Sequence, residues 1–191
     1  SYFAHYEFAS QFEGAERIAE KYGITRLDAD RLGLESQLRA ARAIAEGRFE
    51  TSIIPLEVDV VDENGERTGE RRIVTRDEIP RDTSMEKLAT LKPVAREDGI
   101  HTAGSASQIA DGASAVLVMS AERAEKLGVR PLARIVGTAL VGCDPVLMLE
   151  GPIPATRKLL DRADLTIGDI DVVEINEAFA SVVLAWAKEL Q

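Results

Sequence analysis

From about residue 113 onward, short runs of branched apolar residues alternate with amphipathic stretches. The apolar runs lie at 115–119, 133–141 and 170–175. The amphipathic stretches lie at 120–128, from Pro152 to about 163, and from Asn176 onward. Short apolar runs rich in branched residues are typical of buried strands, and a period near 3.6 is typical of helices. The alternation therefore predicts an α/β fold, with helices packed on a sheet.

The first hundred residues follow a different pattern. An apolar stripe predicts a helix over 8–23, which Gly23 would end. Thr25 and Asp28 form a capping-box pattern for a second helix, which Gly47 would end. The order strand (53–61), turn (63–65), strand (71–75) and short helix (82–91) completes the region. Helices with a hairpin, in place of the later alternation, predict a boundary near residues 100–112.

Length and charge limit the classes of function. A chain of 191 residues makes one modest domain or pieces of two, and the net charge is −10. An acidic chain is not expected to bind nucleic acid in bulk. No apolar run reaches the roughly 20 residues that a bilayer span needs. Cys143 is the only cysteine, which excludes an internal disulfide and favours a reducing, cytoplasmic compartment. Because the sequence starts at Ser1 and stops inside an expected helix, we expect an internal fragment.

A basic stretch from Arg67 to Arg96 is the first candidate site. It holds eight Lys and Arg against five Asp and Glu, in a chain whose net charge is −10. A local positive surface would suit a small polyanion such as a nucleotide phosphate. The alternative is a solvated hairpin face with mixed charges, and charge alone favours that alternative.

A small-residue loop, Thr102 to Ser107 with Asp111 and Gly112 beyond it, is the second candidate. Small residues allow a ligand close to the backbone, and serine hydroxyls can donate to amide or phosphate oxygens. The loop has neither the lysine of a P-loop nor the G-x-G-x-x-G spacing. The alternative is a tightly packed turn between domains.

The segment 174–180, with sequence EINEAFA, is the third candidate. A strand is expected to end there and a helix to begin at Asn176, at the sheet edge where α/β proteins bind ligands. A helix N-terminus favours negative charge, and an asparagine amide could hold a water or an oxyanion. The alternative is that Asn176 is only the helix N-cap, which the bare pattern favours.

The lone Cys143 and the two histidines offer weaker candidates. Neither His5 nor His101 is close to Cys143 in sequence, and the adjacent Asp144 carboxylate disfavours a thiolate. We therefore expect Cys143 to be a buried, inert thiol. No His/Cys cluster has the spacing of metal ligands, so no metal is predicted.

Taken together, these segments stand in the order and spacing of one family, and the sequence resembles a thiolase, an acetyl-CoA C-acyltransferase. The resemblance covers nearly the whole chain, and EINEAFA is its most specific motif. The wording of HTAGSASQIADGA and EINEAFASVVLAWA is closest to actinobacterial thiolases of lipid and steroid side-chain β-oxidation. Further matching segments are ESQLRAARAIAEGRFETSIIPLEV, RDEIPRDTSMEKLATLKPV and DPVLMLEGPIPATRKLL.

The resemblance implies a layered αβαβα thiolase fold, present here in part. Residues 1–108 resemble the loop domain that covers coenzyme A. Residues 109–131 resemble the last strand and helix of the N-terminal core domain, and 132–191 the first half of the C-terminal core domain. The family's nucleophilic cysteine is expected upstream, and its GHP histidine and C-x-G cysteine downstream. Cys143 matches none of these, so the fragment alone is expected to be inactive.

The resemblance also implies roles for particular residues. Asn176 would hold the water of the oxyanion hole. The substrate and CoA contacts would be Ala103 and Ser107 at the pantetheine arm, Arg81 at the adenine end, and Met148 and Phe179 at the acyl pocket. The sequence departs from the family at Ser105, where asparagine is usual and which bears on loop rigidity. It also lacks the usual Met-Gly around residues 11–14, which bears on acyl-chain specificity.

The implied activity is thiolysis of 3-ketoacyl-CoA by CoA to acetyl-CoA and a shortened acyl-CoA, or the reverse Claisen condensation. The resemblance implies no permanently bound cofactor, with CoA and acyl-CoA as substrates, and a homodimer or homotetramer for the full-length protein. No nucleic acid or membrane partner is expected. The alternatives are a non-catalytic thiolase-like protein that binds lipid or CoA, and a structural module.

Overall fold

The computed structural model describes residues 1–190, and the chain divides into two compact units. One unit contains residues 1–29 together with the chain from Leu91 onward, and the other contains residues 30–90. Each unit is described by itself.

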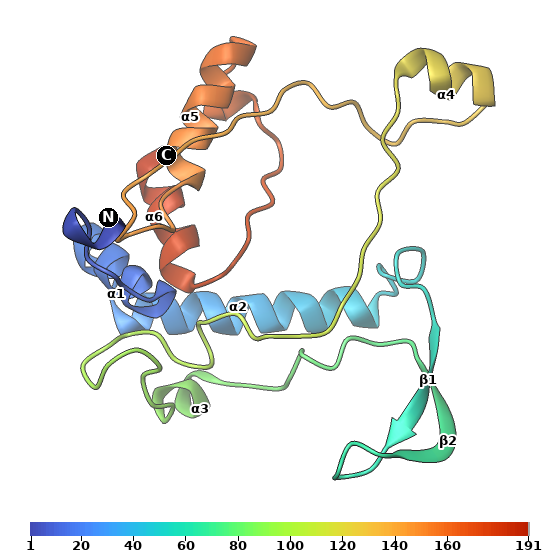
Figure 1. Cartoon of the computed structure of the whole chain (residues 1–191), viewed down its shortest axis with the longest axis horizontal. Coiled ribbons are helices and arrows are strands. Elements are labelled where there is room, and N and C mark those ends of the chain that lie inside the picture. Colours follow the sequence, from blue (N-terminus) through green and yellow to red (C-terminus); the bar gives the residue numbers. More distant parts are fainter. Residues whose placement is uncertain (191) are drawn as a thin grey trace. The chain divides into compact units, whose positions relative to one another are not determined.

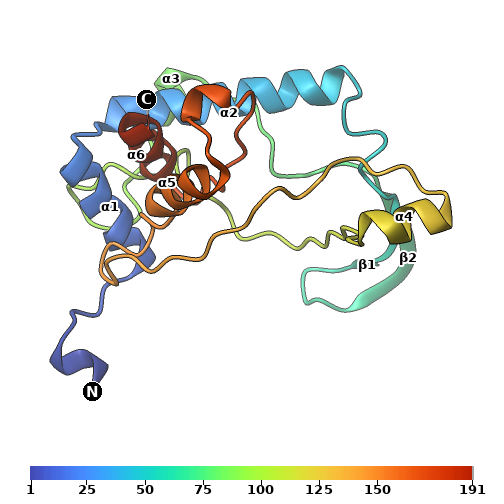
Figure 2. The ribbon, with the colours of Figure 1, turned by 90° about the horizontal axis from the view of Figure 1, so that it is seen from above.

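Three helices form the centre of the first unit. Helix α1 (Gln11–Tyr22) packs against α6 (Ala180–Leu190), and α6 in turn contacts α5 (Pro152–Ala163). Figures 1 and 2 show these helices side by side from two directions. Two apolar clusters lie among them, one of Ala15, Phe179 and Val182 and one of Ile18, Ile153 and Ala185. The unit also contains the short turns η1 (Tyr2–Ala4) and η2 (Ile167–Asp169) and the helix α4 (Ala121–Leu127).

Helix α1 has the local signals that its sequence predicts. The Ser10 hydroxyl accepts a hydrogen bond from the Glu13 amide at the N-terminus, and Gly23 ends the helix with φ of 61°. Near the start, Gly14 lies against the backbone of another segment. A Cβ at Gly14 would stand 3.1 Å from the carbonyl oxygens of both Val146 and Leu147. Glycine therefore allows α1 to approach this segment closely.

The second unit contains most of α2 (Arg26–Ala45) and the strands β1 (Leu56–Val61) and β2 (Arg67–Val74), followed by α3 (Met85–Ala89). Thr25 and Asp28 form the predicted capping box before α2, with each accepting the backbone amide of the other. The two strands pair antiparallel from Leu56 opposite Val74 to Val61 opposite Arg67, with an irregularity after Asp59. Gly65, with φ of 80°, closes the turn between them.

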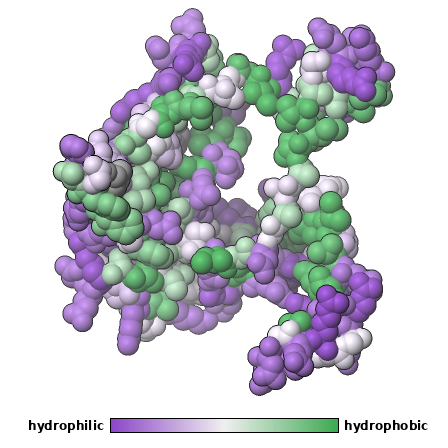
Figure 3. Space-filling model, viewed as in Figure 1, coloured by the Kyte–Doolittle hydropathy of each residue, from purple (hydrophilic) through white to green (hydrophobic). Residues whose placement is uncertain are grey.

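Three strands predicted from the sequence are absent from the described residues. The runs at 115–119, 133–141 and 170–175 are irregular, and the β1–β2 hairpin is the only sheet there. Several of their side chains are strongly exposed, including Val116 (86%), Leu117 (83%) and Leu140 (90%). Figure 3 shows apolar surface along the segments before and after α4. A strand needs a neighbour to satisfy its backbone groups, and these runs have none among residues 1–190.

The predicted start of the last helix is also wrong. Helix α6 begins at Ala180, four residues after Asn176, so Asn176 is not its N-cap. Both α4 and α5 agree with the sequence: Ser120 caps α4, Gly128 ends it, and Pro152 stands in the first turn of α5. In the described part of the chain, no helix combines the length and apolar character that crossing a bilayer requires.

Candidate functional site

The loop of residues 102–107 is attached by its backbone to the segment that enters α6. The amide of Ser107 donates to the carbonyl of Ala178 at 2.9 Å, and the amide of Ala180 donates to the carbonyl of Ser105 at 2.9 Å. Ala106 and Phe179 form the antiparallel bridge between these two bonds. The structure therefore joins the second and third sequence candidates, which are about seventy residues apart in the chain.

The loop has a buried side and an exposed side. Thr102 and Ser105 are buried, and the Ser105 hydroxyl accepts a hydrogen bond from the Thr102 amide at 3.0 Å. The Thr102 hydroxyl accepts one from the Gly104 amide at 3.1 Å. Ala103 and Ser107 are exposed. Ser105 thus closes the turn from inside, and Ala103 and Ser107 lie on its exposed side.

The carboxylate of Glu16 on α1 binds the two residues that precede the loop. Glu16 accepts hydrogen bonds from the amides of Ile100, at 2.9 Å, and His101, at 3.0 Å. Its Oε1 also lies 3.1 Å from Nδ1 of His101. Both side chains are almost completely buried. Hydrogen bonds to a charged acceptor contribute about 1.5–3 kcal/mol each, so Glu16 holds this backbone firmly to α1.

His101 is kept neutral by its surroundings. Burial lowers its pKa below the usual value, and the Glu16 carboxylate offsets only part of that effect. Nδ1 and Nε2 of His101 have no hydrogen-bond partner among the described residues, although Nδ1 lies 3.1 Å from the Glu16 carboxylate. The ring also packs edge-on against Phe179, with centroids 5.3 Å apart.

Phe179 is a core residue at the junction of the loop, α1 and α6. It is 3% exposed and meets Phe12 edge-on, with ring centroids 5.4 Å apart. Ala106 and Leu149 pack on the cluster that contains it. At the entry to α6, the buried Ser181 hydroxyl donates to the carbonyl of Ala15 at 3.2 Å. These contacts fix the strand-like crossing of the loop over 178–180.

Met148 lies in a strained turn, directly before Leu149 in the sequence. It is half-buried, and its φ of 41° is one of two positive values among described residues other than glycine. A left-handed conformation costs a residue with a Cβ roughly 1–2 kcal/mol. Its amide donates to the carbonyl of Asp144 at 2.8 Å, and the thiol of Cys143 donates to the carbonyl of Met148 at 3.3 Å. Cys143 thus supports the turn; the prediction that it is buried is wrong, because it is half-buried.

Asn176 is exposed and lies three residues before Phe179 on the segment that the loop binds. The structure therefore places Asn176, Ala103, Ser107, Met148 and Phe179 in one compact unit. Asn176 precedes a helix without capping it, so it is not committed to a structural role at the helix terminus.

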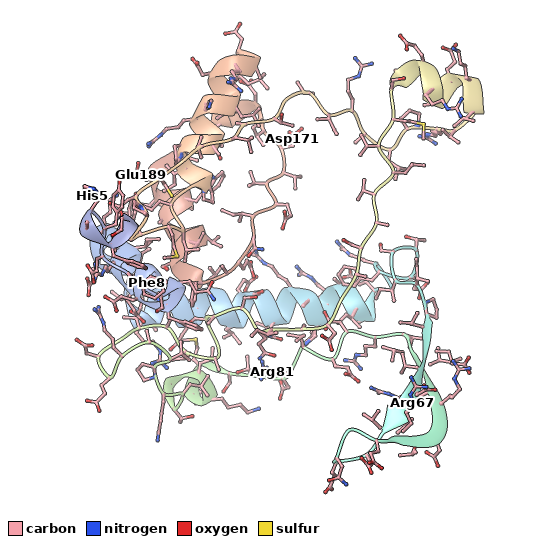
Figure 4. The ribbon with its side chains drawn as sticks, in the orientation of Figure 1. His5, Phe8, Arg67, Arg81, Asp171 and Glu189 are labelled. Atoms are coloured by element: carbon pink, nitrogen blue, oxygen red, sulfur yellow. The ribbon has the colours of Figure 1, made fainter. Side chains whose placement is uncertain are left out.

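Arg81 belongs to the other unit. Its side chain is exposed on the chain between β2 and α3, and its amide donates to the side chain of Gln37 on α2 at 2.9 Å. Figure 4 labels it there, with Arg67 on the hairpin. A shallow cavity of about 340 Å³ has Arg72, Arg76 and Pro80 in its lining, and Pro80 directly precedes Arg81 in the sequence.

Much of the basic stretch is neutralised by ion pairs within the hairpin region. Arg67 pairs with Asp59 at 3.1 Å, Arg71 with Glu57 at 2.9 Å, and Arg72 with Glu78 at 3.1 Å. This agrees with the solvated, mixed-charge alternative for part of the stretch. Among the residues that the structure describes, no group of three or more His, Cys, Asp or Glu side chains is placed to hold a metal ion.

Sequence reasoning missed Glu16 and His101. Their contact joins residues 85 positions apart, and no local pattern records it. One signal was present: Glu16 stands on the apolar stripe of α1, between Phe12 and Ala19 at helical spacing, where an acidic residue needs a buried partner.

Two family profiles cover nearly all of the chain. The profile described as "Thiolase, N-terminal domain" matches residues 7–122, and "Thiolase, C-terminal domain" matches residues 129–191. The chain belongs to the thiolase family.

Particular relatives sharpen this assignment. The chain is 50% identical over 182 residues to the steroid 3-ketoacyl-CoA thiolase FadA6 of Mycobacterium tuberculosis, covering 95% of this chain and 42% of that protein. It is 48% identical over 177 residues to an acetyl-CoA acetyltransferase of Chromobacterium violaceum, covering 92% and 44%. The chain spans less than half the length of these curated relatives.

Solved structures agree on the fold. The crystal structure of the Bacillus anthracis acetyl-CoA acetyltransferase matches with a TM-score of 0.89 at 42% identity, over 97% of this chain and 46% of that one. Human mitochondrial 3-ketoacyl-CoA thiolase matches with a TM-score of 0.85 at 41% identity, over 93% and 44%. The fold is thus part of the α/β thiolase fold, as the resemblance implied.

Proposed function

We propose that the complete polypeptide carrying this chain is an acyl-CoA acyltransferase of the thiolase type. It cleaves a 3-ketoacyl-CoA with CoA to acetyl-CoA and a shortened acyl-CoA, or runs the reverse Claisen condensation. Names of relatives support the reaction class, and the name of the Mycobacterium tuberculosis relative supports a steroid 3-ketoacyl-CoA substrate, with a fatty-acyl substrate as the other possibility of the proposal.

The observation that carries the proposal is the attachment of the 102–107 loop to the 178–180 segment. Two backbone hydrogen bonds of 2.9 Å hold the loop to the segment that follows Asn176. Within that loop, Ala103 and Ser107 are exposed to solvent. Small side chains let the pantetheine arm lie against the backbone, and the Ser107 hydroxyl can bind its amides. Ligand grip and carbonyl polarisation would therefore be set by one rigid junction.

In the proposed reaction, a thiolate outside residues 1–191 attacks the 3-keto carbon, and the C–C bond breaks to give the enolate of acetyl-CoA, which is then protonated. A second CoA thiolate takes the acyl group from the enzyme. Asn176 would hold the water that donates to the developing oxyanion, and Met148 and Phe179 would bound the acyl chain. The strain at Met148 supports its assignment, since strained residues concentrate at functional sites.

The remaining assignments are proposals of the same kind. Residues 1–108 would be the CoA-covering loop domain, 109–131 the end of the N-terminal core domain, and 132–191 half of the C-terminal core domain. Arg81, which belongs to the compact unit of residues 30–90, would bind the adenine end of CoA. The protein would be a cytoplasmic homodimer or homotetramer with no permanently bound cofactor.

The test is steady-state thiolysis by the complete polypeptide, with acetyl-CoA measured by chromatography. Replacing Asn176 by alanine should lower kcat by about 100- to 1000-fold, the usual effect of losing one oxyanion donor. The control is Asn64→Ala, which alters the only other asparagine, in the hairpin turn. Normal turnover by Asn176→Ala would contradict the oxyanion role. CoA binding without any turnover by the unaltered protein would favour the non-catalytic alternative.

Arg81 has a separate test because it belongs to the other unit. Arg81→Ala should weaken CoA binding about tenfold, as expected for the loss of one charged hydrogen bond, without changing kcat. Arg71→Ala, which removes an arginine already paired with Glu57, is the matched control. Unchanged CoA affinity in Arg81→Ala would exclude the adenine-end role.

A further inference from the structure

The residues that precede the proposed CoA-binding loop contact the buried side chain of Glu16 on α1. That carboxylate spends both oxygens on the residues that lead into the loop: Oε2 accepts from Ile100, and Oε1 accepts from His101 and faces its ring. A buried carboxylate needs such partners, and here they are all in one short backbone segment. The loop therefore takes its starting position from α1.

Gly99 shows how closely the carboxylate fits. A Cβ at Gly99 would stand 2.6 Å from Oε1 of Glu16 and 3.0 Å from the carbonyl oxygen of Arg96. Its φ is not in the left-handed region, so space and not backbone conformation excludes a larger residue. The glycine and the glutamate are thus a complementary pair.

His101 transmits this position toward the other end of the loop. Its buried ring contacts both the Glu16 carboxylate and the Phe179 ring, and Phe179 lies opposite Ala106 in the bridge. The carbonyl of His101 accepts from the Val94 amide at 2.9 Å, which ties the same residue to the incoming chain. Displacing His101 would therefore shift the loop at both of its ends.

We propose that Glu16 and His101 are positioning residues that hold the 102–107 loop in the conformation that contacts the pantetheine arm of CoA. The inference rests on the proposed function, because only a CoA-binding loop gives this positioning a catalytic consequence. Neither residue touches the reacting atoms, so their loss should weaken CoA binding more than it slows the chemical step.

The experiment compares Glu16→Gln with Glu20→Gln in the complete polypeptide, by measuring kcat and the KM for CoA. Glutamine keeps the size of residue 16 but presents an amide donor to the backbone donors, which should raise KM for CoA about tenfold and change kcat less than about threefold. Glu20 lies one turn further on α1, is 60% exposed, and pairs with Arg96. Its variant should keep both constants.

A purely structural role would give a different result. A destabilised enzyme has fewer active molecules, which lowers apparent kcat and leaves KM unchanged. That pattern in a folded Glu16→Gln protein would overturn the proposal. If Glu16→Gln does not fold by circular dichroism, Gly99→Ala decides alone, since it keeps the Glu16 carboxylate but forces it to move away from the new Cβ. A raised KM for CoA supports the proposal, and an unchanged KM overturns it.

His101→Phe completes the test. Phenylalanine keeps the ring contact with Phe179 and removes the nitrogen that faces Glu16, so a smaller rise in KM, about threefold, is expected. No rise would exclude His101 from the positioning role. An unaltered protein that binds no CoA would defeat the proposed function and this inference together, whereas normal CoA kinetics with an unaffected KM in Glu16→Gln and Gly99→Ala would defeat only the inference.

Discussion

Two parts of the same compact unit differ sharply in how far their side chains are buried and paired. Around the 102–107 loop, buried polar groups such as Glu16 and Thr102 have partners, and the aromatic ring of Phe179 is enclosed. Along 115–118 and 132–141, apolar side chains such as Leu117 and Leu132 stand in solvent without strand partners among the described residues. The apolar side chains packed around Phe179 are covered within the described residues, and those of the second region are not.

The two regions depend on contacts of different origin. The loop is held by α1 and α6, which form from local signals and meet within residues 1–190. A strand needs neighbouring strands to pair its backbone groups, and it needs helices or a second sheet to cover its apolar faces. We expect the runs at 115–119, 133–141 and 170–175 to pair only in the complete polypeptide.

The largest expected effect comes from removing a buried aromatic side chain, compared with removing an exposed aliphatic one. In the 191-residue chain, Phe179→Ala should lower the free energy of unfolding by about 3–5 kcal/mol, because it empties a filled core position. Leu117→Ala should change it by less than about 0.5 kcal/mol, since that side chain is already exposed. Urea unfolding followed by the fluorescence of Trp186, the single tryptophan, measures both. Equal losses would remove the distinction.

A smaller effect tests the close approach of α1. Gly14→Ala should destabilise the chain by about 1–2 kcal/mol, because the new Cβ would press on two backbone carbonyl oxygens that cannot rotate away. Gly112→Ala is the matched control, since nothing lies within 4 Å of its added Cβ. The same unfolding measurement checks the pair. A stabilised Gly14→Ala would mean that helix propensity outweighs the crowding.

The smallest effect is a pH dependence from His101. Burial lowers the pKa of His101, so the unfolded chain binds a proton more readily than the folded one. The contribution is present above the unfolded value of about 6.5 and is lost as the pH falls from there through the folded pKa. The free energy of unfolding between about pH 7 and 5 should therefore fall less in His101→Phe than in the unaltered chain. Identical slopes would contradict the burial argument.

Local chemistry explains what could be predicted from the sequence. The caps at Thr25, Ser120 and Gly128, the turn at Gly65 and the start at Pro152 depend on residues within four positions of each other. The loop and EINEAFA segments were also identifiable from the sequence, through the family resemblance.

Non-local contacts explain what could not be predicted. The three later strands require partners that no local pattern supplies, and the start of α6 moved to Ala180 because residues 178–180 first pair with the loop. Glu16 acts 84 positions away from the amide it binds at Ile100. The roles of Asn176, Arg81, Met148 and Phe179 stay predictions.

The central claim is that the exposed side of the 102–107 loop contacts the pantetheine arm of coenzyme A. A crystal structure of the complete polypeptide with CoA tests it most directly. We expect the pantetheine arm to lie against Ala103, with the Ser107 hydroxyl about 3 Å from one of the arm's amide groups. CoA bound with its arm on another surface, or Ser107 turned inward in the complex, would contradict it.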